Sequence, residues 1–210
     1  MKVYLAIPTY GIGIDTEIYR NHLLLCASSH GLIRSVGITQ NELVHLARNK
    51  LVKEVLSDDF VDKENDYIFW LDQDIIVAPG ALAQLLSHNK DIVSGLYFQK
   101  APPFYPLIMK KKDESTLCSN NLLEYPAGLN KVDDIGFGCV LTKVSVFSKI
   151  PDPWFEWTKE SGEDIDFCRK ARSHGIDIWY DSCVTCGHQG ERRVFTVDDY
   201  DRVFNRKKEK

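Results

Sequence analysis

The sequence lacks long hydrophobic runs and lacks an excess of basic residues. No apolar stretch approaches the ~18 residues of a membrane span. Lys and Arg number 26 against 30 Asp and Glu, which gives a net charge of −4. The sequence pI of about 5.9 lies well below the ~9 that is typical of nucleic-acid-binding domains. We therefore expect no transmembrane segment and no nucleic-acid partner.

The N-terminus also lacks the pattern of a secretory leader. Residues 1–7 carry one basic residue, and Pro8 follows too early for a full apolar region. The six cysteines are spread through the chain without secretory features, which indicates reduced thiols. These expectations together favour a cytoplasmic protein. The 210 residues suggest one domain, at ~100–200 residues per domain.

The first half of the chain alternates apolar runs with amphipathic segments. A capping box, Thr39 with Glu42, is predicted to open the second helix. The alternation predicts an α/β fold with a mostly parallel sheet. Predicted strands cover residues 2–7, 36–38, 67–71 and 91–97, and predicted helices cover 16–29, 41–56 and 79–88, the last with Pro79 in its first turn.

The second half is less regular. Two or three short strands are predicted between residues 104 and 142, and a helix over 163–174 is predicted to stop at Gly175. A last strand follows over 176–180, and residues 189–196 are expected to form a mobile polar loop. The charged segment from Asn205 to the end is expected to be disordered.

Two carboxylates interrupt the central apolar run, in the sequence Leu71-Asp72-Gln73-Asp74. Ligands of parallel α/β sheets bind at the carboxyl ends of the strands. Residues 72 and 74 point to the same side if the chain stays extended, and two such charges repel unless a cation is near. This favours a Mg²⁺ or Mn²⁺ site that also binds phosphate. A solvent-exposed turn, in which Asp is common, explains the fragment equally well.

Two distant segments add further polar groups. Glu163, Asp164 and Asp166 lie at the start of a predicted helix. Dipole and capping effects, worth ~0.3–1 kcal/mol, explain one or two acids there better than three. His188 follows the last predicted strand, where it is either a ligand or a structural residue.

Taken in order, these segments resemble a nucleotide-sugar glycosyltransferase of the GT-A type, most similar to compact family-2-like enzymes of bacteria and phages. The resemblance covers residues 1–190 and implies a Rossmann-like fold with a central, mostly parallel sheet and a smaller irregular acceptor-side subdomain. It implies one domain over 1–202, with a nucleotide-binding half (1–99), an acceptor and catalytic half (100–202) and a charged tail (203–210). The matching segments are Ile7-Pro8-Thr9-Tyr10, Ala47-Arg48-Asn49, Leu71-Asp72-Gln73-Asp74, Gly136-Phe137-Gly138, Gly162-Glu163-Asp164 and His188.

The resemblance also implies a role for each matching residue. Asp164 would be the general base if the enzyme inverts, and Glu163 would contact donor or acceptor hydroxyls. The metal, Mn²⁺ or Mg²⁺, would be held by Asp74 and His188, with Asp72 in its shell or on the ribose. The nucleotide of a donor, most often a UDP-sugar, would contact Pro8, Thr9, Tyr10, Arg48, Asn49, Asp72 and Gln73. The transferred sugar and the acceptor would contact Gly136, Phe137, Gly138 and Trp157.

The chemistry of sugar transfer fits these assignments. A metal neutralises the charge that develops on the diphosphate leaving group, and a separate carboxylate accepts the proton of the acceptor hydroxyl. Arg192 and Arg193 would close over the diphosphate as a lid, or else form an exposed basic turn. Trp154 and Trp157 would stack on an acceptor sugar, or else pack in the core.

Three other interpretations stay open at this stage. Cys183, Cys186 and His188, with Cys168 or His174, would make a zinc site, although a single cysteine pair favours free thiols. The same acids, joined by Asp133, Asp134 and Asp181, would suit a metal-dependent nucleotide or phosphoester hydrolase. The third interpretation is a non-catalytic protein that binds a nucleotide-sugar. It would keep its function with Asn in place of Asp164.

Overall fold

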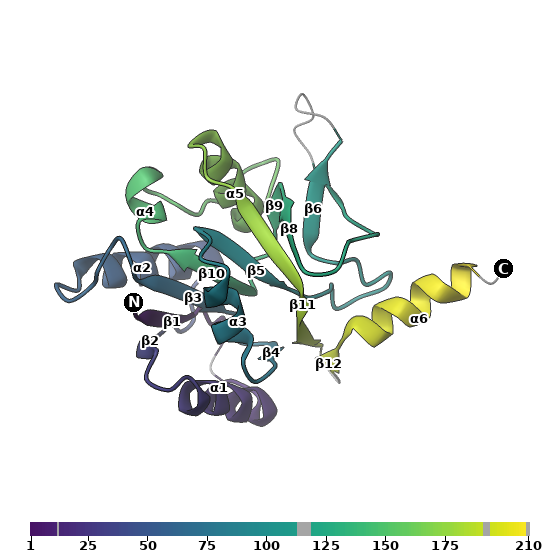
Figure 1. Cartoon of the computed structure of the whole chain (residues 1–210), viewed down its shortest axis with the longest axis horizontal. Coiled ribbons are helices and arrows are strands. Elements are labelled where there is room, and N and C mark those ends of the chain that lie inside the picture. The colour runs from purple at the N-terminus through teal and green to yellow at the C-terminus, as the bar shows by residue number, and fades with distance from the viewer. Residues whose placement is uncertain (12, 113–118, 191–193, 209–210) are drawn as a thin grey trace.

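The structure, a computed structural model, describes residues 1–11, 13–112, 119–190 and 194–208 (Figure 1). Its main sheet has the strand order β12-β11-β5-β10-β3-β1-β2, and β4 and β8 also pair with β11. The strands are β1 Val3–Ile7, β2 Ile33–Ile38, β3 Tyr67–Leu71, β4 Ile75–Val77, β5 Ile92–Leu96, β8 Leu129–Val132, β10 Cys139–Lys143, β11 Ile178–Gln189 and β12 Val194–Phe195.

The centre of this sheet is mostly parallel, as the sequence predicted. Strand β1 is parallel to both β2 and β3, and β5 is parallel to β11. Strand β10 lies antiparallel between β3 and β5, so those two strands share one direction. The carboxyl ends of β1, β2, β3 and β5 therefore meet at one edge of the sheet, which is also where β10 begins.

Apolar side chains on alternating positions divide the core between the two faces of the sheet. In β3, Ile68 and Trp70 face one cluster, and Tyr67, Phe69 and Leu71 face the other. All five are buried, which explains why the strand is continuously apolar and does not alternate with polar residues. Each large side chain buried in this way contributes ~1.5–3 kcal/mol relative to leaving it exposed.

Helices cover both faces of the sheet (Figure 1). Helices α2, α4 and α5 supply apolar residues to the first cluster, and α1 and α3 supply them to the second. A separate sheet, ordered β7-β6-β9, comes from the second half of the chain. The helices are α1 Thr16–Ser28, α2 Val44–Ser57, α3 Ala81–Ser87, α4 Val146–Lys149, α5 Glu163–Ser173 and α6 Val197–Lys208, and the small strands are β6 Ile108–Lys111, β7 Ser119–Asn121 and β9 Asp134–Ile135.

The predicted capping box at the second helix is wrong. Helix α2 begins at Val44 and its N-cap is Leu43, with no side-chain cap. The hydroxyl of Thr39 instead accepts a hydrogen bond from the backbone N–H of Thr9, at 3.1 Å. Thr39 therefore joins the ends of β2 and β1. The third helix begins at Ala81, so Pro79 lies before its first turn.

Two other expectations about the second half are corrected. The last strand is longer than predicted, because β11 continues to Gln189 and pairs there with β4 and β12. The C-terminal segment that was expected to be disordered is helical as far as Lys208, and α6 projects from the body of the protein (Figure 1).

Within the described residues, none of the helices has the length and apolar character needed to cross a membrane.

Candidate functional site

The residues with predicted roles gather at the carboxyl edge of the sheet. Thr9 and Tyr10 follow β1, and Asp72 and Asp74 follow β3. His188 reaches the same edge because β11 pairs with β4, where His188 lies opposite Ile75. The backbone N–H of Gln189 donates to the carbonyl of Asp74 at 2.8 Å. The pairing of β11 with β4 thus brings Asp74 and His188 close together, although they are far apart in the sequence.

Three adjoining cavities occupy this edge. The central one, of about 120 Å³, is flanked by one of about 490 Å³, with which it shares Thr9, and one of about 280 Å³, with which it shares Tyr10 and Val44. The central cavity is lined by Pro8, Thr9, Tyr10, Glu42, Val44, Asp72, Gln73 and Asp74. The larger cavity also contacts Gly11, Gly13, Ile14, Tyr19, Ile38, Thr39 and Gln40, and the third also contacts Leu43, His45 and Trp157.

Among the described residues, Asp74 has two basic partners. Its Oδ1 lies 3.6 Å from Nε2 of His188, and its Oδ2 contacts the ammonium of Lys100. Burial opposes ionisation of Asp74, but hydrogen bonds and charge from His188 and Lys100 outweigh it and lower the pKa of this carboxyl. Asp74 is therefore an anion at neutral pH. Lys100 was missed in the sequence because it lies in a loop, although that loop follows β5 on this same edge.

The ring of His188 is oriented for binding a cation. Nδ1 lies 2.6 Å from the carbonyl oxygen of Phe98. A carbonyl only accepts hydrogen bonds, so Nδ1 carries a proton and Nε2 is the ring nitrogen that faces Asp74. Carboxylate oxygen suits Mn²⁺ and Mg²⁺, and imidazole nitrogen is a ligand of divalent transition metals.

This pair fits a divalent metal, but as a site of two protein ligands. Among the described residues, no group of three or more His, Cys, Asp or Glu side chains is arranged around one metal position. The carboxylate of Asp72 bonds Arg48 and also lines the central cavity, so its role in the metal shell or on the ribose stays a prediction. Metal sites with one or two protein ligands are completed by water and by substrate phosphates.

Arg48 is buried beneath the acids and links two of them. Its Nη2 donates to both carboxylate oxygens of Asp72, at 2.9 and 3.2 Å, and its Nε lies 3.5 Å from Oε1 of Glu163. The guanidinium also lies 5.3–5.9 Å from the ring centres of Trp70, Phe137 and Phe155. Arg48 therefore acts on the site through these acids, because its side chain is only 2% exposed.

Two of the acids hold protons more tightly than usual. Burial, opposed by Arg48 and assisted by Asp74, raises the pKa of Asp72 to about 6. Burial and the neighbouring charge of Glu163 raise the pKa of Asp164 to about 6. A carboxyl group whose pKa lies close to neutral is suited to accept a proton in catalysis.

Trp157 connects the third cavity to the acids. Its indole N–H donates to Oε2 of Glu163 at 2.6 Å, and its ring centre lies 6.4 Å from that of His45. The side chain is 67% exposed, so one ring face is open to a ligand. This exposure is compatible with the predicted acceptor contact.

Several predicted contacts are corrected by burial. Phe137 and Trp154 lie in the core, and the indole N–H of Trp154 donates to the carbonyls of Phe147 and Ile150 at 2.8 and 3.0 Å. The amide of Asn49 bonds the backbone of Trp154 and Phe155 at 2.8–3.2 Å, which leaves it no group for a nucleotide.

Gly136 and Gly138 pack against the buried side chain of Tyr97. A Cβ on Gly136 would lie 2.3 Å from the hydroxyl of Tyr97, and one on Gly138 would lie 2.9 Å from it. The backbone N–H of Gly138 donates to that hydroxyl at 2.8 Å. The expectation that these glycines admit the sugar is thus replaced by a packing role: they make room for a buried tyrosine.

The structure does not support the zinc alternative. Cys183 is exposed, Cys186 is buried beside Cys139, and Cys168 faces the carbonyl of Ile135.

Two acids considered for a hydrolase are engaged in ion pairs: Asp134 pairs with Arg172 at 2.9 Å, and Asp181 with His88 at 2.8 Å. Arg192 and Arg193 lie outside the described residues, so the predicted lid stays a prediction.

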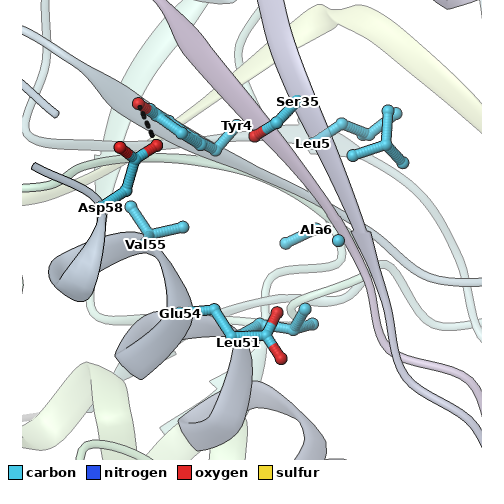
Figure 2. Close-up of a pocket in the computed structure, with 10 residues that line it drawn as sticks. Tyr4, Leu5, Ala6, Ser35, Leu51, Glu54, Val55 and Asp58 are labelled. Carbon is cyan, nitrogen blue, oxygen red and sulfur yellow. Dashed lines mark hydrogen bonds between the residues drawn. The ribbon is translucent and has the colours of Figure 1, made fainter. Parts of the chain in front are cut away.

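A further cavity, of about 230 Å³, lies away from this edge, between α2 and strands β1 and β2. Figure 2 shows Tyr4 bonded to Asp58 at one side of it, with Ser35 and Glu54 also on its wall. None of the residues with predicted roles lines it. The carboxyl edge is therefore the better candidate for a functional site.

Comparisons with known proteins concern the fold. No protein-family model and no curated protein sequence matches the chain. The crystal structure of A197 from STIV matches with a TM-score of 0.65 and 19% identity, over 95% of this chain and 92% of that chain. The crystal structure of GalNAc-T7 with UDP, GalNAc and Mn²⁺ matches with a TM-score of 0.55 and 14% identity, over 97% of this chain and 47% of that chain. This chain thus spans about half of the second structure, and identities this low show a shared fold alone.

Proposed function

We propose that the chain is a metal-dependent glycosyltransferase with a GT-A fold, which moves a sugar from a nucleoside diphosphate sugar, a UDP-sugar, to an acceptor hydroxyl. One observation carries the proposal. A sheet edge holds an Asp74–His188 pair suited to a cation, and a separate carboxyl group at the start of α5, Asp164, interacts electrostatically with Asp72 of that edge and has its pKa raised to about 6. The fold shared with a structure that holds UDP, GalNAc and Mn²⁺ supports the proposal.

The three cavities suggest how the donor would lie. The nucleoside would occupy the largest cavity, between Thr9 and Gln40, at the ends of β1 and β2. The diphosphate would lie over Asp74 in the central cavity, and the acceptor would enter from the side of Trp157. Mn²⁺ or Mg²⁺, held by Asp74 and His188, would neutralise the charge of the leaving diphosphate.

The chain's own residues would perform the remaining steps. Asp164, ionised above its raised pKa, would accept the proton of the acceptor hydroxyl as the new glycosidic bond forms. Glu163 would bind a sugar hydroxyl, since its carboxylate is fixed by Arg48 and Trp157. Arg48 would keep Asp72 in place beside the donor.

Thermal unfolding with UDP, GDP, CDP and dTDP, each with and without Mn²⁺, tests the donor site. A ligand that binds only the native state raises the melting temperature, and 100 times its Kd adds about 2.7 kcal/mol of stability. We expect the largest rise with UDP plus Mn²⁺, and its loss in Asp74→Ala. Asp177→Ala, which removes an exposed acid paired with Lys131, is the matched control and should behave as wild type.

Three outcomes would contradict the proposal. No rise with any nucleotide in the presence of Mn²⁺ would remove the donor site. Hydrolysis or transfer that persists at the wild-type rate in Asp164→Asn would remove the base. A protein that binds UDP-sugar normally but has no transfer activity to lose would be a binding module.

A further inference from the structure

Lys100 occupies the carboxylate that the proposed metal needs. It follows β5, and its ammonium contacts Oδ2 of Asp74 while His188 faces Oδ1. The loop that carries it is anchored at its base, because Gln99 donates to the carbonyl of Tyr105 at 2.9 Å. The side chain itself is 43% exposed, so it has room to move.

We propose that Lys100 is an exchangeable counter-ion which makes metal binding depend on the diphosphate. Without a ligand, the ammonium neutralises Asp74 and weakens the binding of a divalent cation there. When a nucleoside diphosphate enters, its negative charge attracts Lys100 away from Asp74, and the metal takes that place. Lys100 then holds the diphosphate together with the metal. This proposal rests on the function proposed above and assigns Lys100 as a positioning residue for the leaving group.

Electrostatics favours this exchange over simple addition of the metal. An ammonium and a divalent cation on one carboxylate repel each other strongly at ion-pair distances. Among the described residues, the neighbouring groups add no free negative charge that would balance both cations, because Asp72 is engaged by Arg48 and His188 has no acidic group. A diphosphate supplies the missing negative charge. Metal and diphosphate must therefore bind with positive coupling, and the coupling is reciprocal.

The ion pair between Lys100 and Asp74 is weak enough to be exchanged. Both partners are partly exposed, Lys100 by 43% and Asp74 by 28%. Ion pairs of this kind change an equilibrium by about twofold to fivefold. Such a pair reduces the occupancy of the metal without preventing it. A lysine that formed only a surface ion pair would have no effect on the diphosphate.

The test is a set of titrations of the full chain with Mn²⁺ and with UDP. In Lys100→Met, Mn²⁺ without nucleotide should bind about twofold to fivefold more tightly, because Asp74 is free. In the same variant, UDP in the presence of Mn²⁺ should bind more weakly by a factor of about ten, because charged hydrogen bonds to the diphosphate are lost. Lys100→Arg should keep both affinities near wild type.

Two controls separate the exchange from a general charge effect. Lys131→Met removes a lysine that is paired with Asp177 and is 56% exposed, and it should change neither affinity. Uridine, which has no diphosphate, should bind Lys100→Met and wild type equally. Opposite changes for Mn²⁺ and UDP support the exchange, whereas unchanged or weaker Mn²⁺ binding in Lys100→Met would overturn it.

The result also separates this proposal from the function on which it rests. Failure of UDP and the other nucleotides to bind wild-type protein with Mn²⁺ would overturn the donor site, and the exchange with it. Normal UDP binding in wild type, together with unaltered Mn²⁺ and UDP affinities in Lys100→Met, would overturn the exchange and leave the donor site intact.

Discussion

The guanidinium of Arg48 donates hydrogen bonds to both carboxylate oxygens of Asp72, at 2.9 and 3.2 Å, from a position with 2% exposure. Its Nε also lies 3.5 Å from Glu163, at the start of α5. One buried cation therefore connects the acid after β3 with the acids of the second half.

Replacing Arg48 with Met should destabilise the protein strongly. Removal of one partner from a buried ion pair costs about 3–5 kcal/mol, because the other partner stays buried without compensation. Arg48→Lys should cost less, since it keeps the charge but loses the shape of the guanidinium, whose Nη2 bonds Asp72 and whose Nε faces Glu163. Urea unfolding at pH 7.5 measures both, and a loss below about 1 kcal/mol for Arg48→Met would show that solvent already screens the pair.

The Arg48→Met penalty should also depend on pH. Burial raises the pKa of Asp72 to about 6 with Arg48 present, and Arg48 opposes that rise. Without Arg48 the carboxyl should therefore protonate at a higher pH. Below pH 6 both proteins hold a neutral Asp72, so the difference in unfolding free energy should shrink there. A difference that is constant between pH 5 and 8 would contradict the assigned pKa.

Asp164→Asn should stabilise the protein while it removes activity. The pKa of Asp164 is raised to about 6 in the folded protein, against about 4 in the unfolded chain. Above pH 6 the folded state carries a carboxylate that it disfavours, so Asn should add about 1–2 kcal/mol there. The gain should decline between pH 6 and 4 and vanish below pH 4, where both states are protonated.

The same group should set the pH dependence of the wild-type reaction. The base must be ionised, so the rate should fall about tenfold per pH unit below pH 6. Activity is measured by release of the nucleoside diphosphate from the donor. Asp166→Asn, in the same first turn of α5, is the control and should keep both the rate and its pH dependence. A rate that is independent of pH from 5 to 8 would exclude Asp164 as the base.

The sequence predicted the sheet and its acidic edge because both depend on local patterns. The buried run of β3 and the acids at 72 and 74 are adjacent in sequence, and parallel topology then fixes where they lie. Asn49 and Phe137 were assigned wrongly for the opposite reason. Whether a side chain faces the site or the core depends on packing partners such as Trp154, which lie far away in the sequence.

The role of Lys100 illustrates the same limit. A lysine in a loop has no periodicity and no fixed spacing to Asp74. Its contact depends on the order of the strands, in which β10 separates β3 from β5. The start of α2 was also difficult to predict from the sequence. The hydroxyl of Thr39 bonds the backbone of Thr9 and does not cap α2. A tertiary contact of Thr39 therefore replaced the helix cap that the local sequence pattern predicts.

Gly136→Ala should destabilise the protein through Tyr97. The new Cβ would lie 2.3 Å from the tyrosine hydroxyl and 3.2 Å from Cβ of Leu107, and overpacking of this kind costs about 1–3 kcal/mol. Tyr97→Phe removes the hydroxyl and should cost about 1 kcal/mol, since Gly138 loses its acceptor. The double variant should be more stable than the sum of the two losses predicts. Additive losses would mean that Gly136 is required by something other than Tyr97.

The hydrogen bond from Trp157 to Glu163 tests whether the exposed indole orients an acid of the site. The 2.6 Å bond joins an exposed ring to a buried carboxylate, so Trp157→Phe should keep most of the ring surface and lose the bond, at a cost of about 1 kcal/mol. Glu163→Gln and the double variant complete a cycle, which should give a coupling of about 1 kcal/mol.

Trp157→Ala separates orientation from ring contact. If the indole only fixes Glu163, Phe and Ala at position 157 should impair transfer equally. If its face also carries the acceptor, as its 67% exposure allows, Ala should raise the acceptor KM well above that of Phe with little change in donor binding. Equal acceptor KM values in the two variants would assign Trp157 to positioning alone, because a stacked ring contributes through the surface that Phe retains and Ala lacks.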